Sequence, residues 1–349
     1  MNLDSISTTI LDESSSPAAL RRALLEFVQY CAEVTGIHPN PSFDAWAEDS
    51  LLPSGVAINP SAAAHCASDY QRSTVFIRGI YAAIRSLKAR YTDTQLEILY
   101  AGCGPFATLM LPLLGKFSPG EIKLSLLDIH QSSIDSVETL LAHFGLDALK
   151  VDTVRDDACH YQHSQNLHLI IAETMQKSLE QEPQFAVTAN LAPQLAPAGI
   201  FIPQKIAVSL ELADLEGEKQ RFDQCCPPEP AAAAVDSQRT PLATVCLLSA
   251  ERVAQMIKDA RPDPFRRELA LEPVRVTIPA GVDNPRLDAA LFTRITVFEN
   301  HGLGDYESEI TLPLKCPELS PLRAGQSYLV SYHLGQYPRF NFEYLATKP

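Results

Sequence analysis

The sequence predicts an α/β fold, a doubly wound parallel sheet with a helical N-terminal region and a C-terminal antiparallel β domain. Three observations lead to this prediction. A short apolar run breaks into the turn Gly102-Cys103-Gly104, strand and helix patterns alternate over the next hundred residues, and the last third becomes all β between Pro, Gly and Asn turns. We place the three regions at residues 1–90, 91–212 and 213–349.

The first ninety residues show helical patterns. Residues 17–36 have apolar positions at helical spacing, with Ser16 as an N-cap and Gly36 as the stop signal. A second helix is expected from about residue 62 to residue 90. Between them, residues 38–60 are rich in Pro and Ser and predict a loop.

Residues 95 to about 212 alternate between strand and helix patterns, which indicates a parallel sheet. The expected strands are 98–101, 122–128, 151–155, 167–172 and 205–212. The expected helices are 108–115, 132–145 and one around 185–195.

A low-complexity insert opens the third region. It runs Cys225-Cys226-Pro227-Pro228-Glu229-Pro230 followed by four alanines, and it predicts an exposed loop. Beyond a helix near 250–260, strands are expected at 274–278, 291–298, 308–312 and 327–333. Their spacing predicts a small antiparallel sheet or barrel-like domain.

Charge and composition exclude several classes of function. A net charge of -14 without any run of Lys and Arg argues against a nucleic-acid binder. No segment approaches 18 apolar residues and the start does not resemble a secretory signal, so we expect a cytoplasmic protein without membrane contact. The eight cysteines form no Cys-x-x-Cys and no zinc-type spacing with histidine pairs, so we expect reduced thiols and no metal site.

Acidic residues follow the expected strands in an informative order. Asp128 ends the second strand, where a carboxylate can accept both hydroxyls of a ribose. Asp157 follows the third strand, where an acid can accept a hydrogen bond from an adenine amino group, and Glu173 ends the fourth. Together with Gly102 and Gly104, whose missing Cβ atoms let a ligand approach the backbone, this order predicts a nucleoside-binding site. Neither a third glycine nor a P-loop is present.

Residues 173–182 show a resemblance to a known family. The chain resembles the class I S-adenosylmethionine-dependent methyltransferases, and most closely their protein arginine methyltransferase branch. That branch has two glutamates nine residues apart, with a methionine two after the first and a leucine between them, and Glu173, Met175, Leu179 and Glu182 match. Residues 190–203 match the family's helix, Pro-Gly turn and Pro-ended strand. The resemblance implies a Rossmann-like methyltransferase domain under a helical N-terminal lid, with S-adenosylmethionine as the cofactor.

The resemblance also implies roles for cofactor-binding residues. Gly102 and Gly104 would lie under the methionine part of the cofactor, Asp128 would hold the ribose and Asp157 the adenine. Arg78, 24 residues before Gly102, fits the family's arginine that pairs with the cofactor carboxylate.

Arg72 is a second candidate for the same carboxylate. Glu173 and Glu182 would hold a guanidine nucleophile, and one of them would take its proton; we count Glu173 with the cofactor residues as well.

Aromatic rings can face the sulfonium charge. The candidates are Tyr70, which we place among the catalytic residues, and Phe76, Tyr81, Tyr100 and Phe106.

The chain departs from that branch at several positions. Tyr100 replaces an acid before the glycine turn, His168 replaces an aspartate at the start of the fourth strand, and the branch's Thr-His-Trp loop is missing, since the sole tryptophan is Trp46. These departures favour a small-molecule acceptor over a protein arginine. His130 is expected to line the adenosine pocket, and His333 is a further candidate for substrate contact.

Three functions are left open. The first is N-methylation of a small molecule, such as an amino acid or guanidine, in bacterial secondary metabolism. In the second, the cofactor's own amine attacks its γ-carbon and gives azetidine-2-carboxylate and methylthioadenosine, as in an azetidine-2-carboxylate synthase; aminocarboxypropyl transfer is the related case. The third is a non-catalytic binding protein. A small-molecule substrate is the expected partner, with a homodimer as the assembly considered.

Overall fold

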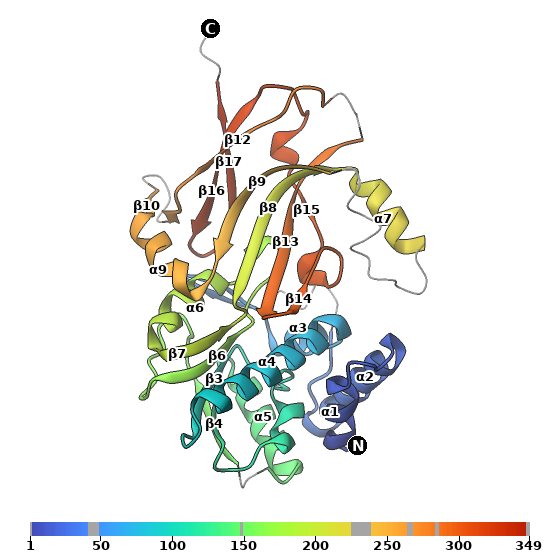
Figure 1. Cartoon of the computed structure of the whole chain (residues 1–349), viewed down its shortest axis with the longest axis vertical. Coiled ribbons are helices and arrows are strands. Elements are labelled where there is room, and N and C mark those ends of the chain that lie inside the picture. Colours follow the sequence, from blue (N-terminus) through green and yellow to red (C-terminus); the bar gives the residue numbers. More distant parts are fainter. Residues whose placement is uncertain are drawn as a thin grey trace.

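The computed structural model describes residues 2–40, 49–146, 149–224, 239–263, 268–282 and 286–346. Helices make up most of the N-terminal region (Figure 1), and one hairpin follows the second helix in the chain. The elements are α1 (Leu3–Leu11), α2 (Pro17–Thr35), β1 (Ser50–Leu52), β2 (Gly55–Ala57), α3 (Pro60–Cys66) and α4 (Tyr70–Arg90). Ser16 caps α2 and Gly36 ends it with φ 75, which confirms both predicted signals.

The predicted single helix from residue 62 to residue 90 is wrong. The helix is interrupted between α3 and α4, because the side chain of Asp69 accepts a hydrogen bond from the Arg72 N–H and begins a new helix. The predicted loop over 38–60 contains the β1–β2 hairpin. Trp46 lies outside the described residues.

The parallel sheet has the strand order β5-β4-β3-β6-β7, with every pair parallel. The strands are β3 (Leu96–Ala101), β4 (Ile122–Asp128), β5 (Lys150–Arg155), β6 (Leu167–Ala172) and β7 (Leu195–Ile202), and the crossovers contain α5 (Gln131–His143) and α6 (Gln184–Leu191). The order reverses between β3 and β6, so right-handed connections place α5 and α6 on opposite faces. This topology confirms the doubly wound α/β class and directs ligands to the carboxyl ends of β3, β4 and β6.

Two predicted elements have a different conformation. The segment after the glycine turn forms a 3₁₀ helix, η2 (Leu111–Lys116), where we expected an α-helix over 108–115, because Pro112 has no N–H to donate. The expected strand 308–312 contains the 3₁₀ turn η5 (Glu309–Thr311) instead. Ser308 begins η5 with a capping box, a local bonding pattern that competes with strand pairing.

The C-terminal region is built from two antiparallel sheets. One contains β8 (Lys205–Ala213), β9 (Thr240–Leu248), β13 (Asp288–Phe298), β14 (His301–Leu303) and β15 (Leu314–Lys315). The other contains β10 (Arg261–Pro262), β11 (Leu269–Ala270), β12 (Val274–Thr277), β16 (Ser327–Leu334) and β17 (Arg339–Leu345). We expected 205–212 in the parallel sheet, but β8 pairs antiparallel with β9 and β13. The division at residues 90 and 212 stays a prediction.

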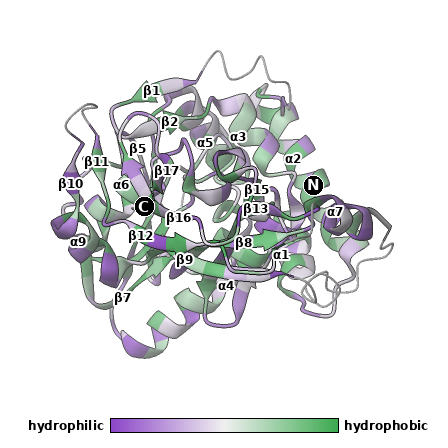
Figure 2. Cartoon of the chain, turned by 90° about the horizontal axis from the view of Figure 1, so that it is seen from above, coloured by the Kyte–Doolittle hydropathy of each residue, from purple (hydrophilic) through white to green (hydrophobic). Residues whose placement is uncertain are grey.

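The β domain is packed directly onto the helical region. Helix α4 contacts β13 and β14, and a Cβ on Gly79 would lie 2.6 Å from the Val297 Cγ1 atom. One hydrophobic cluster therefore runs through the N-terminal helices, the parallel sheet and the β domain. Helix α9 (Ala250–Asp259) contains both hydrophilic and hydrophobic residues (Figure 2), and it buries the side chain of Val253. No helix in the described ranges is long and apolar enough to cross a membrane.

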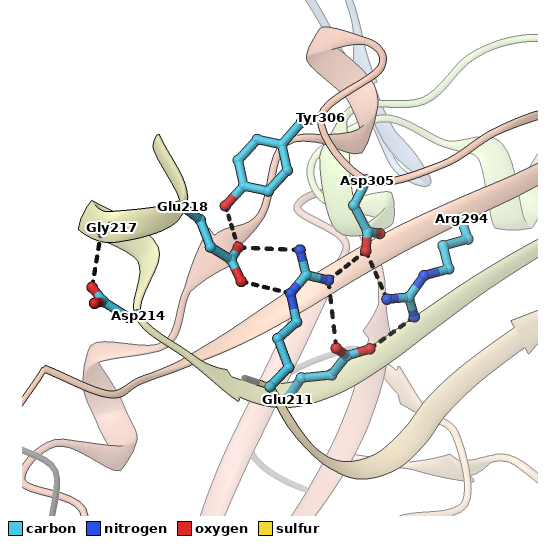
Figure 3. A network of polar contacts seen from close by, with 8 residues as sticks. Glu211, Asp214, Gly217, Glu218, Arg294, Asp305 and Tyr306 are labelled. Atoms are coloured by element: carbon cyan, nitrogen blue, oxygen red, sulfur yellow. Dashed lines mark hydrogen bonds and ion pairs between the residues drawn. The ribbon is translucent and has the colours of Figure 1, made fainter. Parts of the chain in front are cut away.

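A buried ion network ties α7 (Leu215–Gln224) to the β domain (Figure 3). The Arg239 guanidinium pairs with Glu218, with Nε–Oε1 at 2.7 Å, and also contacts the Asp305 carboxylate. Arg294 bridges Glu211 and Asp305 at 2.7 Å each. Three carboxylates thus share two guanidinium groups, so removal of either cation leaves buried negative charge uncompensated.

We expect Arg239→Met to lower the free energy of unfolding by about 3–5 kcal/mol, because Glu218 and Asp305 would lose a buried cation. Urea unfolding followed by circular dichroism measures this loss. The control is Lys315→Met, since Lys315 pairs with Asp288 at the surface and such pairs contribute about 1 kcal/mol or less. Equal losses in the two variants would contradict a buried, cooperative network.

Candidate functional site

A cavity lies at the carboxyl edge of the parallel sheet. Its empty volume is about 1010 Å³, including its opening to solvent. The glycine turn after β3 and the chain ends of β4, β5 and β6 form the floor and sides. The β1–β2 hairpin and α3 contribute Leu52, Val56, Ala63 and Cys66 to the opposite wall.

The glycine turn presents bare backbone to this cavity. Gly102 and Gly104 have φ angles of 70 and 62, which L side chains rarely adopt. A Cβ on Gly102 would lie 2.5 Å from the Thr174 Cγ2 atom, so the turn passes too close to the chain after β6 for any side chain. The N–H groups of Gly102 and Cys103 donate to the Leu127 carbonyl, at 2.9 and 3.1 Å, and hold the turn against β4.

Asp128 ends β4 inside the cavity wall and is 8% exposed. Its Oδ2 atom accepts from the Gly104 N–H at 2.9 Å and its Oδ1 atom from the His130 N–H at 2.9 Å. Each carboxylate oxygen has two lone pairs, so the group can still accept hydrogen bonds from a ligand diol. His130 lines the cavity as expected, and its Nδ1 atom lies 3.4 Å from Asp128 Oδ1.

Asp157 also lines the cavity, after β5, beside Asp156 and Ala158. Its Oδ1 atom accepts from the Cys159 N–H at 2.8 Å, which fixes the side chain. The structure therefore brings Gly102, Gly104, Asp128 and Asp157 to one cavity. Their roles toward a ligand stay predictions.

The two arginine candidates lie at different places. Arg78 donates to the carbonyls of Ile10 and Asp12, at 2.7 Å each, and so ties α4 to the end of α1 outside the cavity wall. Arg72 lines the cavity and pairs with Glu173. Six residues at 100° each rotate the side chain by about 240° around the helix, so the two arginines leave α4 on different faces.

Glu173 and Glu182 both line the cavity and are 8% and 7% exposed. Burial raises the pKa of Glu173 to about 7, while the Arg72 guanidinium opposes that rise. Burial raises the pKa of Glu182 to about 8, and the nearby Glu173 charge adds to it. The Glu173 Oε1 atom is buried without a hydrogen-bond partner, so it is available as an acceptor. The neighbouring Glu182 is mainly uncharged at neutral pH, because its pKa is about 8.

Among the five aromatic candidates, Tyr100 lines the cavity and the other four lie outside its wall. Tyr70, which we placed with the catalytic residues, is a half-buried residue at the start of α4. Phe76 and Phe106 belong to the core. Burial raises the pKa of Tyr100 far above its usual value, so its side chain is a neutral phenol.

The hairpin residues of the cavity wall were not predicted. Leu52 and Val56 flank Gly55, and a glycine between short apolar runs is a hairpin signal that could have indicated them. The hairpin rests on the Glu182 segment, because a Cβ on Gly55 would lie 2.7 Å from the Pro183 nitrogen.

His333 lies outside the cavity wall. Its ring, on β16, is close to two acids, with Nδ1 at 3.4 Å from Glu268 and 3.7 Å from Asp263. Within the described ranges, these three residues form the one group with metal-ligand geometry. The Arg339 guanidinium already binds both Glu268 oxygens, at 2.9 and 2.8 Å.

No family model matches the chain, and no curated protein matches it. Among solved structures, it is similar to a Trypanosoma brucei PRMT1 enzyme–prozyme heterotetrameric complex with AdoHcy, at TM-score 0.47 and 13% identity over 80% of this chain and 96% of that one. It is also similar to Arabidopsis thaliana protein arginine methyltransferase 10 in an open conformation, at TM-score 0.43 and 11% identity over 75% and 86%. At these values the similarity assigns neither an activity nor a ligand.

The raised pKa of Glu182 predicts a pH-dependent stability. The folded pKa of about 8 exceeds the usual 4.5, so the favourable contribution of the protonated acid is complete below pH 4.5 and lost as the pH rises to 8. Glu182→Gln cannot ionise. We therefore expect it to match wild type near pH 4.5 and to exceed its unfolding free energy by about 5 kcal/mol above pH 8, since each unit between the two pKa values is worth about 1.4 kcal/mol.

Urea unfolding at a series of pH values measures this difference. The matched control is Glu343→Gln, which makes the same change on the exposed part of β17. A difference between Glu182→Gln and wild type that stays constant with pH would contradict the buried, protonated state of Glu182.

Proposed function

We propose that this protein is an S-adenosylmethionine-dependent transferase that acts on a nitrogen nucleophile of a small molecule. The observation that carries the proposal is the meeting of two features in one cavity. The glycine turn and Asp128 form a nucleoside-type cradle. Glu182 adds a buried acid that has no ion pair among the described residues.

The residues present fit this cofactor. Bare backbone at Gly102 and Gly104 would accommodate its methionine part, the Asp128 carboxylate its ribose hydroxyls and Asp157 its adenine amino group. Arg72, rather than Arg78, would pair with its carboxylate, because Arg72 lies in the wall and a guanidinium binds a carboxylate in two-pronged fashion. The unpartnered Glu173 Oε1 atom is available to a donor from the same ligand. When bound, the cofactor supplies an electrophilic carbon on a sulfonium.

The charge of the wall supports a cationic ligand. Among the described wall residues, five carboxylic acids face a single arginine, Arg72. The acids are Asp128, Asp156, Asp157, Glu173 and Glu182. S-adenosylmethionine has a net positive charge, because its ammonium and sulfonium outweigh its carboxylate. After Arg72 has neutralised one acid, the wall retains negative charge for such a ligand.

Glu182 is the group best suited to move a proton. A nitrogen nucleophile reacts only when its lone pair is free, and Glu182 can accept the proton that the nitrogen must lose. A base with a pKa near the working pH is efficient in this step. The Arg72–Glu173 pair holds the first carboxylate in place, and the hairpin and α3 line the wall of the cavity.

Intramolecular cyclisation of the cofactor is a second candidate, and Tyr100 favours it. A neutral phenol stands where the resemblance calls for an acid, so no carboxylate at that position would hold the cofactor's amine as an ammonium. In this reaction the nitrogen bonds to the γ-carbon, the carbon–sulfur bond breaks, and methylthioadenosine leaves with the sulfur electron pair. Glu182 would take the proton that the ammonium loses.

The products decide between the two reactions. Incubation with S-adenosylmethionine alone should give no product under the first reaction, and S-adenosylhomocysteine should appear in mass spectra once amines, guanidines or amino acids are added. Methylthioadenosine with azetidine-2-carboxylate, formed from S-adenosylmethionine alone, would assign cyclisation. Absence of all these products under both conditions would overturn the proposed function.

Glu182→Gln should reduce turnover by about 100-fold or more, because a positioned base contributes roughly 10²–10⁴-fold. Wild-type turnover should rise with pH toward 8 as Glu182 ionises. Calorimetry should show nearly unchanged affinity for S-adenosylmethionine in the variant. Full turnover in Glu182→Gln, with Glu343→Gln as the reference, would exclude Glu182 as the base.

Gly102→Ala should weaken S-adenosylmethionine binding by at least about ten-fold, equal to 1.4 kcal/mol, because the new Cβ meets Thr174 at the cavity. The matched control is Gly36→Ala. Gly36 has a similar φ of 75 but open space around it, so this variant has the backbone strain without the contact. Titration calorimetry on both variants checks the prediction, and equal affinities would contradict the assigned cradle.

A further inference from the structure

The segment that ends at Glu182 has an unusual backbone. Ser178, Leu179 and Gln181 all have positive φ angles, of 59, 59 and 64, although none is glycine. Each such residue costs on the order of 1–3 kcal/mol and persists only where its surroundings fix it. Three such residues lie within four positions, directly before the buried acid Glu182. They indicate a backbone conformation that contacts with other parts of the chain hold in place.

Two side chains of the β domain hold the first half of this segment. Thr293, on β13, accepts a hydrogen bond from the Ser178 N–H at 3.0 Å. The Tyr332 hydroxyl, on β16, donates to the Leu179 carbonyl. Thr293 and Tyr332 are each 1% exposed, so water does not substitute readily for either contact.

The second half is held at Gln181 from two sides. Its N–H donates to the Pro338 carbonyl, between β16 and β17, at 2.8 Å. Its own carbonyl accepts from the Val56 N–H of the hairpin, also at 2.8 Å. Glu182 therefore directly follows Gln181, whose backbone is hydrogen-bonded to both the C-terminal and the N-terminal regions.

We propose that the β domain positions Glu182 for proton transfer, with Tyr332 and Thr293 as positioning residues that hold residues 178–181 in their left-handed conformation. The proposal rests on the proposed function, which gives Glu182 its task. Neither positioning residue lines the cavity, so each acts through the segment and without touching a ligand.

Loss of these contacts has a specific consequence. Without the Tyr332 hydroxyl the buried Leu179 carbonyl loses its partner, and residues 178–181 relax toward ordinary backbone angles. Glu182 then moves and gains solvent, while Gly102 and Asp128 stay in place on other strands. Proton transfer should suffer and cofactor binding should not, because a displacement of about 1 Å can cost 10²-fold in rate.

The test compares Tyr332→Phe and Thr293→Val with two matched variants. Tyr328→Phe removes a hydroxyl on the same strand that bonds to Gln326 and not to the segment. Thr293→Ser keeps the acceptor for the Ser178 N–H. We expect Tyr332→Phe and Thr293→Val to lower kcat by about 10–100-fold with an S-adenosylmethionine Kd within about two-fold of wild type. The rising limb of the pH profile should move to lower pH as Glu182 gains solvent, and Thr293→Ser and Tyr328→Phe should behave like wild type.

Amide hydrogen exchange in ligand-free protein is the second readout. Peptides covering residues 176–184 should exchange faster in Tyr332→Phe and Thr293→Val than in wild type or Tyr328→Phe. Unchanged exchange, or faster exchange with wild-type kcat and pH profile, would overturn the positioning proposal. Failure of wild type to turn over S-adenosylmethionine overturns the proposed function instead, so the two failures are distinguishable.

Discussion

The contact between Arg72 and Glu173 is the interaction on which the site depends. A buried carboxylate and a largely buried guanidinium are costly alone, and each is tolerated because the other is present. The pair joins α4 to the end of β6 and so fixes one cavity wall against the sheet. Arg72 forms its ion pair with Glu173 and not with Glu182, while burial raises the pKa of both glutamates.

The site is assembled from all three regions of the chain. The parallel sheet supplies the glycine turn and Asp128, the hairpin and α3 supply another wall, and no described residue of the β domain lines the cavity. The contribution of the β domain is to hold the segment before Glu182, through contacts at Leu179 and Gln181. Under the proposed function, the three regions would divide the work into binding, covering and positioning.

The sequence predicted those elements that local residue patterns determine, such as buried strands. Strands 122–128 and 167–172 have the bounds expected, because long apolar runs between turn signals are strong evidence for buried strands. Which of the two arginines, Arg72 or Arg78, lines the cavity could not be predicted well from the sequence. The answer depends on where α4 begins and hence on the Asp69 cap. The left-handed segment had no sequence signal, since none of its strained residues is glycine and its partners are over 100 positions away.

The position of Tyr332 in the chain has a consequence for the order of events during synthesis. Its contact with Leu179 spans 153 positions, and such long-range contacts form late. The parallel sheet is complete at Ile202, so the cradle can form while the rest of the chain is still being made. The contact between Tyr332 and Leu179 has to wait for β16, which is made well after the parallel sheet. Under the proposed function, a nascent chain would therefore bind S-adenosylmethionine before Glu182 is positioned for proton transfer.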